Sequence, residues 1–328
     1  MRYQFGALLP AFAAIVTICS GQPRPPLVPA GQIALPGVHG RIDHLSADPP
    51  RQLLVVSALG NGTVEIVDLG SGRRERELEH LREPQGVLID PESKRLFVAC
   101  GGDGTVRSYD AATFAPLKTV DLGDDADNVR YDSRNDDIVV GYGSGGLATF
   151  DASLREISKL RVPAHPESFQ IEQHGPKTFV NLPDSREIAV VDRTQNRVLQ
   201  QWHDFPAQSN FPMALDEANH RLFVGFRAPA RLMVFDTGSG KVVASLPAVG
   251  DTDDLFYDST LHRIYMTGGE GWVDVFQQRD PDHYESIARV PTSPGARTGL
   301  YVSALRRLFV AAPLHGAEPA RILVYRTE

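Results

Sequence analysis

The sequence has few cysteines, which disulfide-bonded proteins require, and no excess of basic residues, which nucleic-acid-binding proteins require. Only two of its 328 residues are cysteines, so a disulfide-stapled scaffold is excluded and a hydrophobic core must stabilise the fold. Lysine and arginine (33) are outnumbered by aspartate and glutamate (41), which excludes a basic surface for nucleic acid or for a membrane. The 42% hydrophobic and 23% charged residues nevertheless indicate a globular protein and exclude a disordered chain.

Long hydrophobic runs are also scarce, and the one present lies at the N-terminus. Residues 5–18 are apolar, follow a basic residue and precede a polar, Pro-rich segment. This order is typical of a secretory signal peptide, whereas a spanning helix needs about 20 apolar residues. We expect residues 1–21 to be a signal peptide, residues 22–30 to be a Pro-rich linker, and the mature protein to be periplasmic or extracellular without a transmembrane span. A lipid anchor at Cys19 is the less favoured alternative, because the residue before it is bulky.

A short apolar run recurs seven times, at intervals of 40 to 44 residues. The second residues of these runs are Leu54, Phe97, Val139, Phe179, Phe223, Tyr265 and Phe309. Each run is preceded by one further short strand pattern and followed by two, with turn residues between them and an alternation of period two. Four short antiparallel strands, repeated seven times, predict an all-β fold: a seven-bladed β-propeller that occupies residues 31–328 as one domain.

The last repeat indicates how such a ring would close. It ends after its third strand, near Arg326, and lacks a fourth. The N-terminal segment 32–36 resembles the fourth strand of the fifth repeat, at 244–247. Because an open ring would leave exposed strand edges, we predict that the N-terminal segment completes the last blade.

One repeat also carries a family resemblance. Residues 95–123 read RLFVA…GTVxxxDxxTxxxxxTVxLG, which resembles the YVTN family of bacterial seven-bladed propellers, and the likeness extends over nearly all of the mature chain. The resemblance implies the propeller fold. It implies no particular function, because such propellers serve as binding modules, scaffolds and enzymes.

A glycine-rich segment, Gly141–Gly146, matches the spacing of a dinucleotide-binding fingerprint. That motif requires a following helix, whose N-terminus receives the pyrophosphate. Here an apolar strand pattern follows, and the glycines align with the hairpin turns of the two preceding repeats, around Gly60 and Gly101. We interpret the segment as a hairpin turn.

Some polar residues do not recur from repeat to repeat, and they lie at one position of the repeat, just before the innermost strand. The innermost strands align on Asp48, Asp90, Asp132, Glu172, Asp216, Asp258 and Val302. Four to seven residues before these anchors the sequence turns polar and differs from repeat to repeat. Propeller topology brings all seven segments to one mouth of the central channel, where we expect a single asymmetric site.

The residue types at this mouth indicate three roles. Carboxylate and amide oxygens favour Ca²⁺ over Zn²⁺ as a cofactor, and the candidate metal ligands are Asp43, Asp127, Asn128, Glu167 and Asp254. The candidate ligand-binding residues are Arg41, Gln85, Arg130, Asn210, Asp253 and His315. The candidate catalytic residues are His44, His165 and Arg297.

These residues leave several functions open. The favoured hypothesis is an exported propeller that binds a small molecule or a divalent cation at the channel mouth. The alternative is a metal-assisted, lactonase-like hydrolase or a lyase, with His44 or His165 as the general base. A protein-interaction scaffold is a third hypothesis. The ring of charges could also be a network of salt bridges around a water-filled channel.

Overall fold

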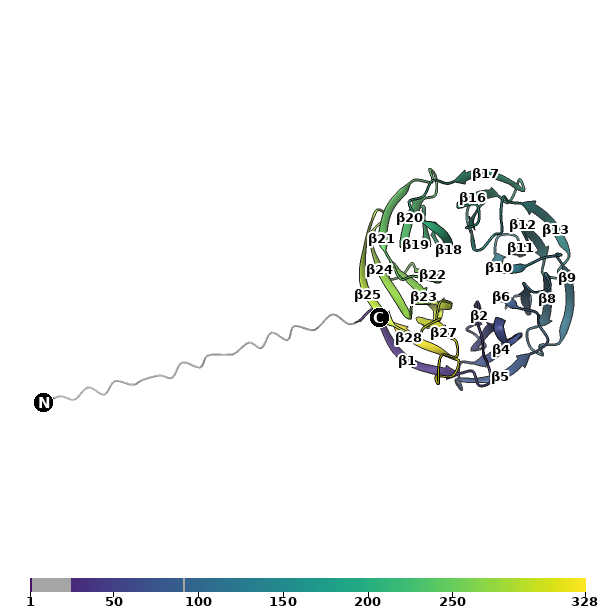
Figure 1. Ribbon diagram of the computed structural model, residues 1–328, viewed down its shortest axis with the longest axis horizontal. Helices are drawn as coiled ribbons and strands as arrows, with labels where there is room; N and C mark the ends of the chain where they lie inside the picture. Colours follow the sequence, from purple (N-terminus) through teal and green to yellow (C-terminus); the bar gives the residue numbers. More distant parts are fainter. Residues whose placement is uncertain (2–24, 91) are drawn as a thin grey trace.

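The computed structural model describes residues 1, 25–90 and 92–328, in which it contains 28 strands and two short 3₁₀ helices, Leu59–Asn61 and Ser303–Leu305. The strands form seven four-stranded antiparallel sheets, arranged as the blades of a ring (Figure 1). The predicted seven-bladed β-propeller is therefore confirmed. The predicted signal peptide lies outside the described residues, Met1 excepted. Within the described part of the chain, no helix is long and apolar enough to cross a membrane.

Blades 1 to 6 place their strands in sequence order from the axis outwards, and blade 7 follows the same order except that β1 is its outermost strand. The innermost strands are β2 (Leu45–Asp48), β6 (Pro84–Asp90), β10 (Ala126–Asp132), β14 (Phe169–Ile171), β18 (Gln208–Asp216), β22 (Thr252–Asp258) and β26 (Gly299–Val302). The second strands are β3 (Leu53–Ala58), β7 (Arg95–Cys100), β11 (Asp137–Tyr142), β15 (Lys177–Leu182), β19 (Arg221–Ala228), β23 (Arg263–Gly268) and β27 (Arg307–Ala312).

The two outer strands of each blade complete the sheets, and blades 1 to 7 are numbered here by the order of their innermost strands. The third strands are β4 (Thr63–Asp68), β8 (Thr105–Asp110), β12 (Gly146–Asp151), β16 (Glu187–Asp192), β20 (Ala230–Asp236), β24 (Trp272–Asp280) and β28 (Arg321–Thr327). The outermost strands are β5 (Arg73–Leu78), β9 (Pro116–Asp121), β13 (Glu156–Arg161), β17 (Arg197–Trp202), β21 (Val242–Pro247), β25 (His283–Pro291) and β1 (Leu27–Ala34).

The ring is closed by the N-terminal strand, in agreement with the sequence prediction. Strand β1 pairs antiparallel with β28 in blade 7, with Leu27 opposite Thr327 and Ala34 opposite Arg321 (Figure 1). The strand begins upstream of the predicted segment 32–36 and includes residues predicted to be linker. Because the strand starts earlier, Leu27 is also buried and packs against blade 7. Ile33, further along the strand, is buried as well.

The hydrophobic core is divided among the seven interfaces between neighbouring blades. One apolar cluster lies at each interface; Phe97 of blade 2, for example, packs with Phe150 of blade 3. The second and third strands together supply most of these side chains, whereas an outermost strand such as β9 is largely exposed. Cys100 is buried within one cluster, and burial raises the pKa of its thiol to about 11, so the thiol is unreactive.

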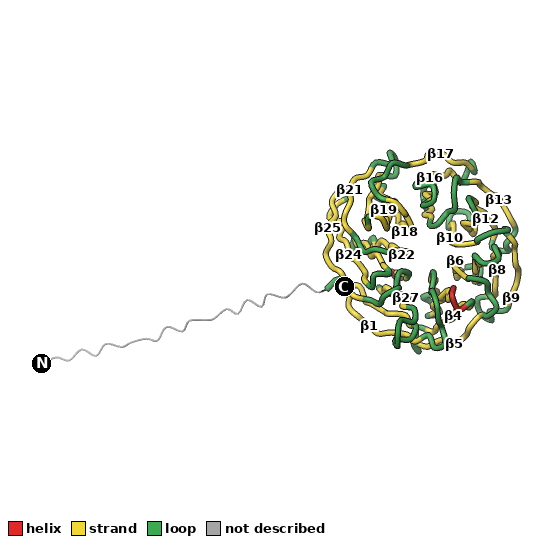
Figure 2. Tube along the Cα trace, in the orientation of Figure 1, coloured by secondary structure: helices red, strands yellow, loops and turns green. Residues whose placement is uncertain are grey.

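The glycine-rich segment around Gly143 forms a hairpin turn. Strand β11 ends at Tyr142 and β12 begins at Gly146, so a strand follows the glycines and the dinucleotide-binding alternative is excluded. Figure 2 shows strands and loops throughout the ring, with a short helical turn beside β4. The molecule is thus a rigid cylinder whose loops and inner strands carry the polar residues.

Candidate functional site

Some polar residues of the channel mouth stand on β-bulges of the innermost strands, and others, such as His165 and Glu167, lie in the loops before these strands. In four blades the pairing register shifts at the same point of the repeat, between Pro84 and Val87, Ala126 and Val129, Asn210 and Met213, and Thr252 and Leu255. The bulge of blade 3 contains Asp127 and Asn128, and that of blade 6 contains Asp253 and Asp254. A bulge breaks the alternation of a strand and re-aims its side chains, so consecutive residues here both line the channel.

Three side chains from blades 3 and 4 form a cluster that we call the mouth triad: Asp127, His165 and Glu167. His165 Nε2 lies 3.5 Å from Asp127 Oδ2 and 3.8 Å from Glu167 Oε2, and one ligand atom of each residue lies within 4.8 Å of the other two. His165 Nδ1 donates a hydrogen bond to the backbone oxygen of Gly143 at 2.7 Å. This bond fixes the ring so that Nε2 faces the two carboxylates, which is how metal-binding histidines are oriented.

Two arginines hold the next pair of carboxylates. Arg41 lies 3.0 Å from Asp43 and 3.6 Å from Asp253. Arg227 also pairs with Asp253, donates to the backbone oxygen of Thr252 at 2.8 Å, and stacks over a phenylalanine ring. These guanidinium groups pair with Asp43 and Asp253, whereas within the described part of the chain no arginine or lysine forms an ion pair with Asp127 or Glu167.

A chain of contacts continues from the triad into the channel. Asn128 Nδ2 donates to the backbone oxygen of Glu167 and lies 3.3 Å from His44 Nε2. His44 Nδ1 lies 3.3 Å from Asp254 Oδ1, and Asp254 also accepts the backbone N–H of Gly299 at 2.9 Å. The residues of blades 1, 3, 4 and 6 that the sequence assigned to one site are therefore in mutual contact.

Several buried polar atoms of this region lack a hydrogen-bond partner among the described residues. They are both carboxylate oxygens of Asp43, Oδ1 of Asn128 and Oδ2 of Asp253. Each of these side chains is at least nine-tenths buried. Because an unsatisfied buried polar atom is costly, these atoms mark a place where a bound ligand would complete the structure.

The carboxyl groups of the mouth hold their protons unusually strongly. Burial, with the charges of Asp127 and Asp253, raises the pKa of Glu167 to about 8. Burial also raises the pKa of Asp253 to about 7, although Arg227 opposes the shift, and it raises the pKa of Asp43. Burial is the largest cause of each of these three shifts, and the nearby arginines and histidines offset it only in part.

The two histidines of the mouth are shifted in the same direction. Burial alone would lower the pKa of His44, but Asp254 and Asp43 raise it to about 10. The Asn128 amide N–H lies beside His44 Nε2 and opposes protonation of that nitrogen. A neutral donor has a smaller effect on the pKa of His44 than two carboxylates have. Against burial, Asp127 and the Gly143 carbonyl raise the pKa of His165 to about 9. A general base must be unprotonated at working pH, so these shifts do not favour the base role predicted for either histidine.

We expect the free energy of unfolding to fall as pH rises from 7 to 10. The folded-state pKa values of Glu167, His165 and His44 all exceed their unfolded values of about 4.3 for Glu and 6.5 for His; the native state therefore keeps protons that the unfolded chain has released. Their stabilising contribution is complete below the unfolded pKa and is lost as pH passes the folded pKa. Urea midpoints measured without added cation should decrease across this range, and Glu167→Gln should flatten the decrease below pH 8. A pH-independent midpoint would contradict the assignment.

The channel has a pocket at the mouth and a chamber below it. The mouth pocket, of about 350 Å³, is lined by the triad and by Arg41, Gln85 and Asp125. A narrow constriction at Asn128 and His44 separates it from a chamber of about 230 Å³ inside the ring. The triad therefore faces a space large enough for a small molecule.

The remaining predicted site residues are placed less centrally. Gln85 lines the mouth pocket and donates to Asp125 at 2.9 Å, whereas Arg130 lines the deeper chamber. Arg297 pairs with Asp251 at 2.8 Å and lines neither cavity.

Two other predicted ligand-binding residues have structural surroundings. Asn210 is fully buried and donates to the Asn181 side chain and to the backbone oxygen of Glu187, both at 2.9 Å, so it joins blade 5 to blade 4. His315 is exposed on a loop that is closed by its backbone pairing with Glu318.

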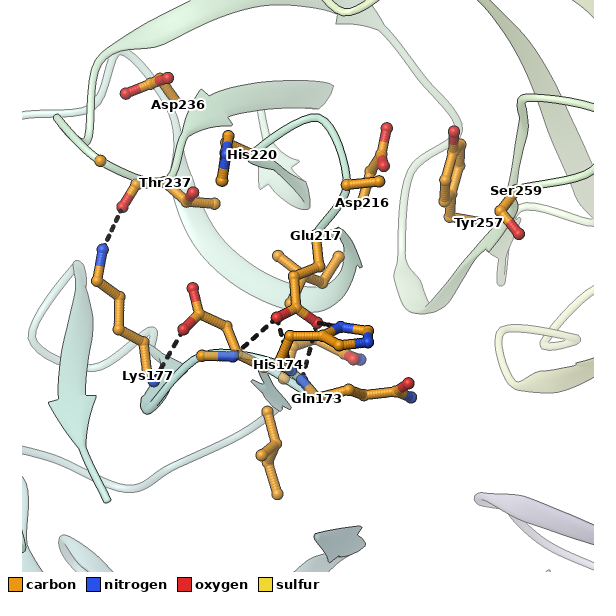
Figure 3. A pocket seen from close by; sticks show the side chains of 17 residues that line it. Gln173, His174, Lys177, Asp216, Glu217, His220, Asp236, Thr237, Tyr257 and Ser259 are labelled. Carbon is orange, nitrogen blue, oxygen red and sulfur yellow. Dashed lines mark hydrogen bonds and ion pairs between the residues drawn. The ribbon is translucent and has the colours of Figure 1, made fainter. Parts of the chain in front are cut away.

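The largest cavity lies at the other end of the inner strands, between blades 4 and 5. It has a volume of about 1090 Å³. Figure 3 shows that its polar side chains bond to neighbouring backbone: Glu217 accepts N–H bonds from Gln173, His174 and Gly175, and Lys177 Nζ donates to the Thr237 carbonyl. Since these groups are satisfied by the chain itself, the smaller mouth pocket is the stronger candidate site.

Comparison with known proteins supports the fold. No family model matches the chain, and no curated protein matches its sequence. Among solved structures, it is similar to the hydrazine synthase of Kuenenia stuttgartiensis, with a TM-score of 0.76 and 16% identity over 89% of this chain and 99% of that one. It is also similar to a chain of a mitotic checkpoint complex, with a TM-score of 0.78 and 14% identity over 100% of this chain and 98% of that one. At these identities the likeness shows the propeller fold alone, and membership of the YVTN family stays a prediction.

Proposed function

We propose that the protein binds a divalent cation at the channel mouth through Asp127, His165 and Glu167. The observation that carries the proposal is the convergence of one imidazole nitrogen and two carboxylates, with their ligand atoms within 4.8 Å of one another. The imidazole is fixed by its bond to Gly143. A bound cation would supply positive charge beside Glu167, whose pKa is raised by burial and by neighbouring carboxylates.

The donor set favours a transition metal over Ca²⁺. The sequence favoured Ca²⁺ because oxygen donors dominated the candidate ligands. With His165 as a ligand, the set becomes one nitrogen and two oxygens, a combination suited to Zn²⁺ and related ions. Three protein ligands leave a coordination position open towards the mouth pocket, so a small molecule in that pocket would reach the metal directly.

Cation binding is expected to release protons. At pH 7 the triad holds protons on His165 and Glu167, whose pKa values are about 9 and about 8, and a metal ligand must be deprotonated. We therefore expect about one to two protons to be released per Zn²⁺ bound at pH 7, and fewer at pH 9. Calorimetric titration with ZnCl₂ in two buffers of different ionisation enthalpy measures this number.

The same titration tests the proposal as a whole. The purified chain, treated with a chelator and then freed of it, should bind one Zn²⁺, and Ca²⁺ should bind at least roughly tenfold more weakly. Zn²⁺ at 100 times its dissociation constant stabilises the fold by about 2.7 kcal/mol, so the melting temperature should rise by roughly 5 °C.

A matched variant separates coordination from general electrostatics. Asp124 lines the same pocket without belonging to the triad, so Asp124→Asn removes an equal charge and should leave Zn²⁺ affinity nearly unchanged. Failure of the wild-type chain to bind Zn²⁺ or Ca²⁺, or a loss on Asp124→Asn as large as that on Asp127→Asn, would refute the proposed site.

A further inference from the structure

The chamber inside the ring has a different chemistry from the mouth. It is lined by the residues that lie two positions before the repeat anchors, which point to the axis: Ser46, Leu88, Arg130, Gln170, Phe256 and Leu300. Arg130 and Gln170 belong to the adjacent blades 3 and 4. Blade 7, which carries Leu300, lies across the axis of the ring from them (Figure 1). Charged and apolar side chains therefore both line the chamber, since Asp254 and His44 stand beside Phe256 and Leu300.

Arg130 is a guanidinium group without an anionic partner among the described residues. Arg41, Arg227 and Arg297 each form an ion pair, whereas the contacts of Arg130 are the backbone oxygen of its neighbour Val129, at 3.0 Å, and the ring of Phe169, 5.7 Å from its centroid. A guanidinium keeps its charge in proteins and presents five N–H donors. Most of these donors are free to meet a ligand in the chamber.

The carboxylate nearest to the chamber is already engaged. Asp254 lines the same space, but its two oxygens face His44 Nδ1 and the backbone N–H of Gly299. Burial lowers the pKa of Arg130, and the negative charges of Asp254 and Asp127 offset this effect only in part. A guanidinium that lines a cavity inside the ring with so little compensation is suited to receive an external anion.

The apolar side chains of the lining indicate what the rest of the ligand resembles. Phe256 and Leu300 come from blades 6 and 7, and Leu88 comes from blade 2, next to the blade that carries Arg130. The volume of about 230 Å³ corresponds to about seven or eight water molecules at ~30 Å³ each, which suits a compact organic acid. Gln170 lines both the chamber and the large cavity at the far end of the strands.

We propose that the channel chamber binds a small monocarboxylic acid with an apolar body. Arg130 receives the carboxylate in a bidentate ion pair, Gln170 lies beside it, and the apolar side chains of blades 2, 6 and 7 take the hydrocarbon part. This site is separate from the proposed metal site, and it does not require that a metal be bound.

Calorimetric titration with benzoate tests the proposal, with benzamide and benzylamine as neutral and cationic analogues of the same shape. Benzoate should bind with at least roughly tenfold higher affinity than benzamide, since the charge-assisted bonds to Arg130 are lost in the amide, and benzylamine should not bind. Inorganic phosphate should bind more weakly than benzoate, because it has no apolar part. Absence of benzoate binding, or equal affinities for benzoate and benzamide, would overturn the proposal.

Variants of the chamber complete the test. Arg130→Met should lower benzoate affinity at least roughly tenfold, and Arg130→Lys should have a smaller effect, because the charge remains and the bidentate geometry is lost. Arg134→Met, at an exposed position in the turn after the same strand, is the control and should bind benzoate as the wild type does. Removing an unpaired buried charge should also leave the melting temperature of Arg130→Met unchanged or higher. Unaltered benzoate binding by a folded Arg130→Met variant would contradict the assignment, whatever happens to Zn²⁺ binding at the mouth.

Discussion

A chain that begins at residue 37 is expected to lose the stable monomeric fold that a chain beginning at residue 25 retains. The deletion removes β1, whose residues pair along β28, and with it the buried side chains of Leu27, Ile33 and Leu35. At about 1.5–3 kcal/mol for each buried side chain, the loss is about 5–9 kcal/mol. A typical domain has only 5–15 kcal/mol in total.

The deletion also leaves the edge of β28 unpaired, and an exposed strand edge promotes association between chains. Size-exclusion chromatography and thermal unfolding followed by circular dichroism compare the two chains directly. We expect the shorter chain to aggregate or to melt at a much lower temperature, and a synthetic peptide of residues 25–36 to restore the fold by pairing with β28. A shorter chain that stays monomeric with an unchanged melting temperature would show that β1 does not close the ring.

The double variant Asp127→Asn, Glu167→Gln is expected to lower Zn²⁺ affinity by more than about 100-fold. Changing even the groups that orient a metal ligand costs 10–100-fold in affinity, and here two of three ligands lose their charge. Without metal, the same variant should differ little in stability from the wild type. It removes the buried carboxyl group of Glu167, whose pKa burial raises, but it also removes the Asp127 carboxylate that raises the pKa of His165.

Two measurements on this variant distinguish coordination from damage to the fold. Calorimetry gives its Zn²⁺ affinity, and urea denaturation in the presence of a chelator gives its stability. A variant that is much less stable than the wild type yet binds Zn²⁺ normally would contradict both expectations. Asp124→Asn, at the rim of the same pocket, should match the wild type in affinity.

The fold was predictable because the repeat is a direct consequence of how a propeller packs. Each second strand is buried on both faces between two blades, as Phe97 and Phe223 show, so each repeat must supply an apolar run at the same place. Closure was predictable because the last repeat lacks a strand that the N-terminus supplies. The start of β1 at Leu27 was missed because a Pro-rich composition obscures strand alternation.

The candidate site was predictable in position more than in detail. The polar segments converge as the topology requires, and His44, Asn128 and Asp254 are in contact. The bulges that turn consecutive residues to the axis could not be predicted, because they depend on pairing with β11 and β23 and not on local sequence. The sequence assigned His165 as a general base, whereas the structure places its Nε2 beside the Asp127 carboxylate.

The part played by Arg227 was also missed. It was not among the candidate site residues, because it lies outside the aligned segments, near the end of β19 in blade 5. The structure brings its guanidinium onto Asp253 and over the ring of Phe211. The signal that could have revealed it was the charge balance of the mouth: the carboxylates in the aligned segments exceed the arginines there, so cations from neighbouring loops were to be expected.

The pairing of β1 with β28 has a consequence for biosynthesis. Leu27 is among the first described residues to be made, and its partner Thr327 is next to the last residue of the chain. At a synthesis rate of about 5–20 residues per second, the first strand waits about 15–60 s for its partner. Blade 7 therefore assembles only after Thr327 has been synthesised, and during that interval the unpaired N-terminal strand is a segment that a chaperone can bind.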